Sequence, residues 1–101
     1  MPEFTIERVG IPNLDFSGEM IGQSADASGK IKIYRTKAGH YVAEIKVDSK
    51  RSNAAHFDQP QLVVNWFMSV QGSITPDAQA AIEAAATRDE GFKKIWNEQV
   101  D

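Results

Sequence analysis

The chain has 101 residues, enough for one globular domain and too few for two. Hydrophobic residues make up 42 % and charged residues 25 %, which excludes wholesale disorder, and the absence of cysteine excludes disulfides, thiolate zinc sites and cysteine nucleophiles. The net charge of −3 hides a basic middle, because residues 30–51 carry seven bases and two acids whereas each flank has a net charge of −4.

The first half of the chain alternates apolar and polar residues with the period of two that half-buried strands show. A turn at 10–13 and a polar loop at 23–29 interrupt this alternation. Gly18 lies within one of the alternating runs and marks a β-bulge or the close approach of another element. The alternation predicts four strands between about residues 3 and 48, at 4–7, 14–20, 31–36 and 41–47.

The turn between the third and fourth of these strands can be assigned a register. With 37–39 as a three-residue loop, Gly39 takes the left-handed position that glycine favours. Apolar residues then pair with apolar ones on one face, and opposite charges pair on the other. A two-residue turn at 38–39 would set Ile33 against Glu44 and mix the faces, so the three-residue loop is favoured.

A polar linker at 48–53 separates the strands from a segment with the helical period of 3.6. Asp58 is the expected cap of the first helix, because Gln61 lies three residues further on and completes a capping-box-like pair. Gly72 is expected to close this helix. The residues expected on its inward face are Val63, Trp66, Phe67 and Val70.

Two more helices are expected before the end of the chain, so that helices occupy about residues 58–100. The sequence Thr75-Pro76-Asp77 is typical of a helix start, and Asp89 can cap a short final helix. The residues expected to face inward are Ala78, Ile82 and Ala85 in the second helix and Phe92, Ile95, Trp96 and Val100 in the third.

These elements predict a single α+β domain over residues 1–101, in which a four-stranded antiparallel meander is covered on one face by two or three C-terminal helices. No segment has the basic start and apolar run of a signal peptide, and the longest apolar stretch is too short to cross a bilayer. We therefore expect a cytoplasmic protein that makes no contact with a membrane.

The chain offers few groups for catalysis or metal binding. His40 and His56 are its two histidines, and no second histidine lies at a metal-ligand spacing, so both are expected to be exposed or capping residues. There is no nucleophile elbow, P-loop or dinucleotide-binding glycine pattern. We expect no enzyme activity, no catalytic residue, no metal and no cofactor.

The basic segment 30–51 is the most distinctive feature of the sequence. Lys32, Tyr34 and Lys46 can share a solvent-facing side of the hairpin, with Lys37 at the turn. Such a surface could contact phosphates and stack on a base. The alternative is a solvated sheet face whose lysines guard an edge strand, and the acidic flanks favour it because they repel a polyanion.

Two short motifs of the chain are shared with a known group of proteins. One runs from Phe16 to Gly22, and the other, Tyr-Arg-Thr-Lys-Ala-Gly, from Tyr34 to Gly39. Together with the final Glu-Gln-Val-Asp, they resemble the EXLDI family of small bacterial proteins, which carry an F-x-G segment, a Y-R-T-x-x-G hairpin and a Glu-x-Leu-Asp-Ile end. This chain lacks the final isoleucine and the N-terminal segment that in those proteins resembles a ribbon-helix-helix element. The resemblance implies a bacterial origin and transfers no catalytic or binding residue.

We expect a non-enzymatic interaction or accessory module whose partner is another protein or a second copy of the chain, because helix and strand signals agree locally while no catalytic constellation is present. A homodimer through the first strand or an exposed sheet face is expected, since lysines guard the third and fourth strands. Two alternatives stay open. One is a nucleic-acid-associated accessory protein that uses residues 30–51, and the other is a small-molecule binding domain or enzyme whose site is assembled from distant residues.

Overall fold

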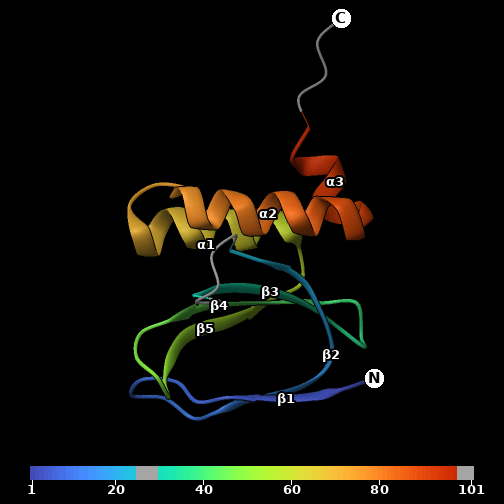
Figure 1. The fold of residues 1–101 in the computed structure, drawn as a ribbon. Coiled ribbons are helices and arrows are strands. Elements are labelled where there is room, and N and C mark those ends of the chain that lie inside the picture. Colours follow the sequence, from blue (N-terminus) through green and yellow to red (C-terminus); the bar gives the residue numbers. More distant parts are fainter. Residues whose placement is uncertain (25–29, 98–101) are drawn as a thin grey trace, which may run out of the picture.

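Five strands are followed by three helices in the computed structural model, which describes residues 1–24 and 30–97 (Figure 1). Neighbouring strands pair antiparallel in sequence order, and the helices lie together on one side of the sheet. The expected α+β class, with C-terminal helices covering one sheet face, is confirmed. The strands are β1 (Glu3–Ile6), β2 (Leu14–Gln23), β3 (Ile31–Thr36), β4 (Tyr41–Lys46) and β5 (Ser52–Phe57). The helices are α1 (Pro60–Gln71), α2 (Pro76–Arg88) and α3 (Glu90–Ile95).

The fifth strand, β5, occupies a region where the sequence predicts a linker and the approach to a helix. It reads Ser-Asn-Ala-Ala-His-Phe and pairs with β4 in unbroken register, from Tyr41↔Phe57 to Lys46↔Ser52. Small and polar residues with low strand propensity fill most of it, so no alternation of large apolar residues marks the strand. Pairing with β4 overrides this weak local preference and extends the four-stranded meander by one strand, to residue 57.

The hairpin between β3 and β4 has the register that the sequence predicts. Ile33 pairs with Ala43, and the three-residue loop 37–39 joins the strands. Gly39 has a φ of 84°, in the left-handed region, and its N–H donates to the Thr36 carbonyl over 2.9 Å. The three-residue turn is therefore confirmed.

The long strand β2 bends, and this bend curls the sheet. Its first part pairs with β1 and its second part with β3, and the second pairing shifts register between Met20 and Gly22 at a β-bulge. Gly18 lies where the two parts join, and a Cβ at this position would collide with the backbone carbonyl of Arg35. The close approach of another element predicted at Gly18 is thus confirmed.

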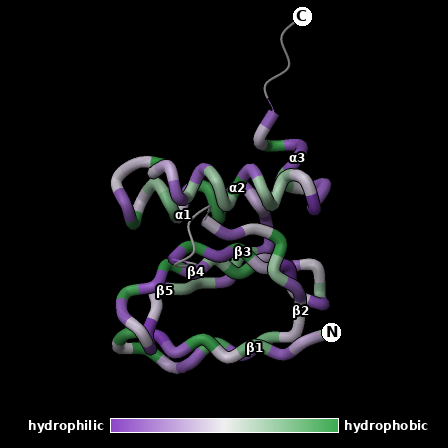
Figure 2. The backbone as a smooth tube through the Cα atoms, in the orientation of Figure 1, coloured by the Kyte–Doolittle hydropathy of each residue, from purple (hydrophilic) through white to green (hydrophobic). Residues whose placement is uncertain are grey.

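The curl brings the two edge strands of the sheet together. The Ser52 N–H donates to the Glu7 carbonyl over 2.9 Å, and Arg8 forms a parallel bridge with Ser52. The Arg8 guanidinium also donates to the carbonyls of Pro12 and Ala54, over 2.8 and 3.3 Å. β1 and the first part of β2 consequently form a layer of their own, with β3, β4 and β5 between it and the helices (Figure 2). The second part of β2 packs directly on α2, where a Cβ at Gly22 would collide with the Ala81 carbonyl.

Two hydrophobic cores lie on the two sides of the central strands, so both faces of β3 and β4 are covered in the described part of the chain. The larger core lies between the sheet and the helices, and its fully buried members include Ile31, Ile33, Val63, Phe67, Ile82 and Phe92. The smaller core fills the inside of the curl with Ile6, Tyr34, Val42 and Ala54, against which Phe4, Leu14, Phe16 and Met20 pack.

Helix α1 begins later than the sequence predicts. Its N-cap is Gln59, which is extended and makes no side-chain capping bond, so the cap expected at Asp58 is wrong. Proline disfavours helical conformation in the residue before it, and Pro60 therefore fixes the first helical position. The helix ends at Gly72 with a φ of 77°, as expected.

The inward face of α1 is narrower than the hydrophobic pattern suggests. Val63 and Phe67 are completely buried and Trp66 is half-buried against the larger core. Val70 is 44 % exposed, so the inward position expected for it is wrong. This position lies in the last turn of the helix, where it lines an open hollow beside β5.

The other two helices begin where the sequence predicts. The Thr75 hydroxyl accepts the Ala78 N–H over 3.2 Å, and Asp89 Oδ2 accepts the Phe92 N–H over 3.0 Å. The residues expected to face inward from α2 and α3 are buried or half-buried, apart from Val100, which lies outside the described residues. None of the helices within residues 1–24 and 30–97 is long and apolar enough to cross a membrane.

Replacing Phe67 by alanine should lower the free energy of unfolding by about 3–5 kcal/mol, because the ring is fully buried and its loss leaves a cavity. Met68 is the matched control, since it is the next residue of the helix and is 51 % exposed. Met68→Ala should cost less than about 1 kcal/mol. Urea denaturation measures both values, and equal losses in the two variants would contradict the packing of α1 on the sheet.

Candidate functional site

The structure spreads the four residues predicted to form a basic binding surface over different parts of the molecule. Lys46 ends β4 at one end of the sheet, whereas Lys37 lies in the loop at the opposite end of the hairpin. Lys32 is half-buried on β3. Tyr34 is only 4 % exposed, so the solvent-facing position expected for it is wrong.

Tyr34 is buried because β1 and β2 curl over its side of the sheet. Its ring lies 4.8 Å from the ring of Phe4 and 5.1 Å from that of Phe16, measured between centroids. Its hydroxyl donates to Glu44 Oε1 over 3.0 Å, and the Ser52 hydroxyl donates to Glu44 Oε2 over 2.7 Å. Burial and the Glu44 carboxylate raise the pKa of Tyr34 well above its ordinary value. The ring is part of a core and is not available to stack on a base.

Four exposed cations gather at the end of the sheet that holds Lys46. This basic corner consists of Lys30, Lys46, Lys50 and Arg51. The Lys46 N–H donates to the Lys30 carbonyl over 2.7 Å, which brings the start of β3 beside the end of β4. Asp48 accepts the N–H groups of Lys50 and Arg51 over 2.8 and 2.7 Å, and these bonds lower the pKa of its carboxyl.

A cavity of about 390 Å³ opens at the other end of the curl, between the β1–β2 hairpin and the β3–β4 loop. We call it the mouth cavity. Its apolar floor is formed by Leu14, Phe16 and Val42. Its polar rim is formed by Asp15, Ser17, Thr36, Lys37, His40 and His56. Of the four residues predicted for the basic surface, Lys37 is the one that lines this cavity.

Both histidines are exposed, as expected, yet the fold brings them to the same cavity. His56 reaches the mouth cavity because it pairs with Val42 across β4 and β5. His40 follows the turn, and its N–H donates to the Thr36 hydroxyl over 3.0 Å. Sixteen positions separate the two residues in the sequence, and the strand that joins them was not predictable from its composition. Only the pairing of β5 with β4 reveals this constellation.

Exposed apolar side chains gather where the β1–β2 loop approaches α1. This β5-side apolar surface consists of Val9, Ile11, Leu62, Trp66 and Val70. Val9 and Ile11 are 48 % and 54 % exposed, and they line one hollow together with Trp66 and Val70. Leu62, Trp66 and Val70 follow one another at intervals of four, so they form a stripe along the helix.

The outer edge of β5 lies beside this surface. The Ser52 N–H points to Glu7 and away from β4. Successive amides of a strand point to opposite edges, so the amides of Ala54 and His56 also point to the outer edge. Arg8 covers the Ala54 carbonyl, while the edge beyond it stays open. None of the six residues of β5 carries a formal charge at neutral pH when histidine is neutral.

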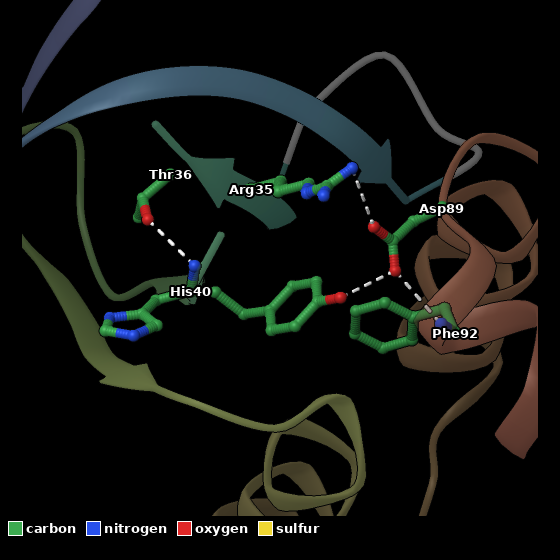
Figure 3. A network of polar contacts seen from close by, with 6 residues as sticks. Arg35, Thr36, His40, Asp89 and Phe92 are labelled. Atoms are coloured by element: carbon green, nitrogen blue, oxygen red, sulfur yellow. Dashed lines mark hydrogen bonds and ion pairs between the residues drawn. The ribbon is translucent and has the colours of Figure 1, made fainter. Parts of the chain in front are cut away.

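Asp89 has a carboxylate buried at the junction of the sheet and the helices (Figure 3). Its Oδ2 accepts the Tyr41 hydroxyl over 2.8 Å and the Phe92 N–H over 3.0 Å, and Oδ1 lies 3.5 Å from Arg35 Nη1. Burial and the hydrogen bond to Asp89 raise the pKa of Tyr41 to about 12. Both oxygens are engaged, so this carboxylate acts as a structural anchor. In the described part of the chain, no group of three His, Asp or Glu residues could hold a metal ion.

A larger depression, of about 650 Å³, lies between the end of α2 and α3. Its lining mixes both signs of charge, with Arg88 and Lys93 facing the same space as Glu83 and Glu90. This mixture favours no class of ligand. The mouth cavity, with one apolar side and one polar rim, is the better candidate for a ligand site.

The two tyrosines of the chain should resist ionisation while the protein is folded, because the pKa of Tyr41 is raised to about 12 and that of Tyr34 is raised as well. In the unfolded chain both phenols ionise near about pH 10. The stability that they contribute is therefore complete below about pH 10 and is lost as the pH rises through about 12. Tyrosinate absorbance, titrated with and without denaturant, measures this difference. A folded-state transition near about pH 10 for either phenol would contradict its burial.

Compared with known protein families, curated proteins and solved structures, the chain matches none of them. The resemblance to the EXLDI family stays a prediction from short motifs. The function of the chain has to be argued from its own surfaces.

Proposed function

We propose that the chain is a non-enzymatic interaction module that associates through the outer edge of β5 and the β5-side apolar surface. The observation that carries this proposal is the meeting of Val9, Ile11 and Val70, each at least 44 % exposed, at one hollow beside an edge strand without formal charge. Leu62 extends the same stripe along α1. Soluble monomers rarely gather exposed apolar residues, and they protect open strand edges with charges or proline. Both features together are typical of an interface.

The partner that fits this edge best is a second copy of the chain. Antiparallel pairing of the end of β5 beyond the Ala54 carbonyl with its own copy about a twofold axis presents the same donors and acceptors on both sides, which is the self-complementarity that a symmetric dimer requires. The neutral strand brings no like charges together, although the whole chain carries a net charge of −3. The same rotation sets the apolar stripe of α1 near its copy.

The dimer contact proposed here differs from the first strand and the exposed sheet face expected from the sequence. β3 and β4 are inner strands, so their lysines guard no edge, and the sheet face opposite the helices is filled by the β1–β2 hairpin. β1 is an edge strand, but Glu3 and Glu7 on or beside it would approach their copies in a symmetric pairing. The residues of β5 itself carry no formal charge, and the charged group at its outer edge is the Arg8 guanidinium, which is held on the Ala54 carbonyl.

The carboxylates inside the fold also support a role without catalysis. Asp89 and Glu44 each accept two hydrogen bonds from the chain itself, and these bonds hold the layers together. A general base needs an accessible lone pair within reach of a substrate proton. Neither carboxylate is arranged in that way.

A nucleic-acid-associated role is the second candidate, and the basic corner favours it. Lys30, Lys46, Lys50 and Arg51 are exposed at one end of the sheet, where they could contact phosphates. The aromatic partner expected for a base is missing from this corner, because Tyr34 is buried. We therefore place this role behind self-association.

Val70→Lys should convert a dimer into a monomer, because it places a charge in the middle of the proposed contact. Met68→Lys is the matched control, since it adds the same charge to the same helix at a position that is 51 % exposed and lies outside the β5-side apolar surface. Light scattering across the micromolar range should give twice the chain mass for the native protein and for Met68→Lys, and the single mass for Val70→Lys. Thermal melts of all three check that the fold is kept.

Two results would contradict this proposal. One is a native chain mass that stays at the monomer value at every concentration. The other is a dimer that persists equally in both lysine variants, which would place the contact elsewhere on the molecule.

Binding of the native chain to single-stranded DNA or RNA should be weak and indifferent to sequence at physiological salt, since the cations of the basic corner act without an aromatic platform. Replacing Lys46 and Lys50 by glutamine should remove most of what binding there is. Fluorescence anisotropy at several salt concentrations measures it. A submicromolar dissociation constant at physiological salt would move the nucleic-acid role to first place.

A further inference from the structure

The mouth cavity has the size of a site for a small organic molecule. Its volume of about 390 Å³ lies within the range of small-molecule pockets and is too small for a folded partner. It lies at the open end of the curl, where the β3–β4 loop and β5 face the β1–β2 hairpin. Of its lining residues, His56 belongs to β5, the strand that also carries the proposed dimer edge.

The floor of the mouth cavity is apolar and held in place from below. Val42 is 1 % exposed, and the Phe16 ring is fixed between the rings of Phe4 and Tyr34, at centroid distances of 5.2 and 5.1 Å. Tyr34 itself is anchored by its hydrogen bond to Glu44. A floor of this kind offers a preformed contact for an aromatic ring or a branched aliphatic group.

The rim of the cavity offers donors without partners. Within the described residues, the Lys37 ammonium and the imidazoles of His40 and His56 make no side-chain hydrogen bond or ion pair. The acidic group on the rim is Asp15, and its carboxylate already accepts the Thr5 hydroxyl over 2.7 Å. The second oxygen of Asp15 still offers lone pairs on the rim, so the groups that would meet an anion are the Lys37 ammonium and the imidazole N–H groups.

The arrangement favours a small anion over a polyanion. The rim donors and the basic corner lie at opposite ends of β4, and a strand of six residues is about 20 Å long. A phosphate backbone would have to cross this distance to contact both the basic corner and the rim. The donors at the mouth instead surround an apolar floor that a phosphate chain leaves unused.

We infer that the mouth cavity binds a small carboxylate with an apolar body, such as an aromatic or branched-chain acid. The apolar body rests on Leu14, Phe16 and Val42, and the carboxylate meets Lys37 and the two imidazoles. This site lies beside the dimer contact, with which it shares His56 of β5, and it gives the interaction module a ligand of defined chemistry.

Benzoate is a suitable probe, and benzyl alcohol is its neutral counterpart with the same ring. Titration of the full chain, followed by NMR shifts of the Leu14 and Val42 methyl groups and the two imidazoles, should show saturable binding of benzoate. Benzyl alcohol should bind about tenfold more weakly, because a charge-assisted hydrogen bond is worth about 1.4 kcal/mol or more. The imidazole shifts should follow those of the methyl groups with one dissociation constant.

Three exposed positions and one control separate the site from non-specific anion binding. Lys37→Gln, His40→Gln and His56→Gln should each weaken benzoate binding by about threefold to tenfold without changing the melting temperature. Lys46→Gln, in the basic corner, should leave the affinity unchanged. The inference is overturned if benzoate shifts no methyl group of the floor, if benzyl alcohol binds as well as benzoate, or if Lys46→Gln weakens binding as much as Lys37→Gln.

Discussion

The rest of this structure depends on the curl of the sheet, which ends where the edges of β1 and β5 meet. The contact is small, a backbone bond of 2.9 Å from Ser52 to Glu7 and a side-chain bond from Arg8 to the Ala54 carbonyl. Its consequence is large, because it turns the second face of β3 and β4 from a solvent surface into the inside of a core. The mouth cavity and the half-open edge of β5 both follow from this closure.

The Asp89 carboxylate fixes the position of the helices on the other face of the sheet. It caps α3, binds the Tyr41 hydroxyl on β4 and lies beside Arg35 on β3, so one buried group joins three elements. The helices therefore cover the sheet in a fixed position and leave α1 with its stripe of Leu62, Trp66 and Val70 beside β5. The proposed interface depends on this placement.

Local signals predicted the elements that are governed by neighbouring residues. The β3–β4 register followed from the loop glycine and from the pairing of apolar residues with apolar residues across the two strands. Thr75 and Asp89 were recognisable as helix caps. Asp58 failed as a cap because the proline two residues later outweighs the capping-box pattern. In each of these cases the deciding residues lie within a few positions of one another.

The site was much less predictable, because it is built from non-local pairings. β5 has few residues that favour strands, and its place beside β4 is a property of the whole sheet. Without β5, neither the meeting of His40 and His56 nor the neutral edge could be seen. The solvent-facing position expected for Tyr34 is wrong for a related reason. Alternation of apolar and polar residues shows which side chains share a sheet face, but it does not show whether a distant hairpin covers that face.

Hydrogen exchange at the Ser52 amide is the most direct test of the curl. In a flat meander this N–H points away from β4 into solvent, whereas in the curled sheet it donates to Glu7. We expect it to be protected nearly as well as the paired amides of β4. The Glu7→Pro variant keeps the acceptor carbonyl but disturbs the strand that carries it, so the protection of Ser52 should fall in that variant. Rapid exchange of Ser52 in the native chain, while the β4 amides stay protected, would show that the edges do not meet and would contradict the curl.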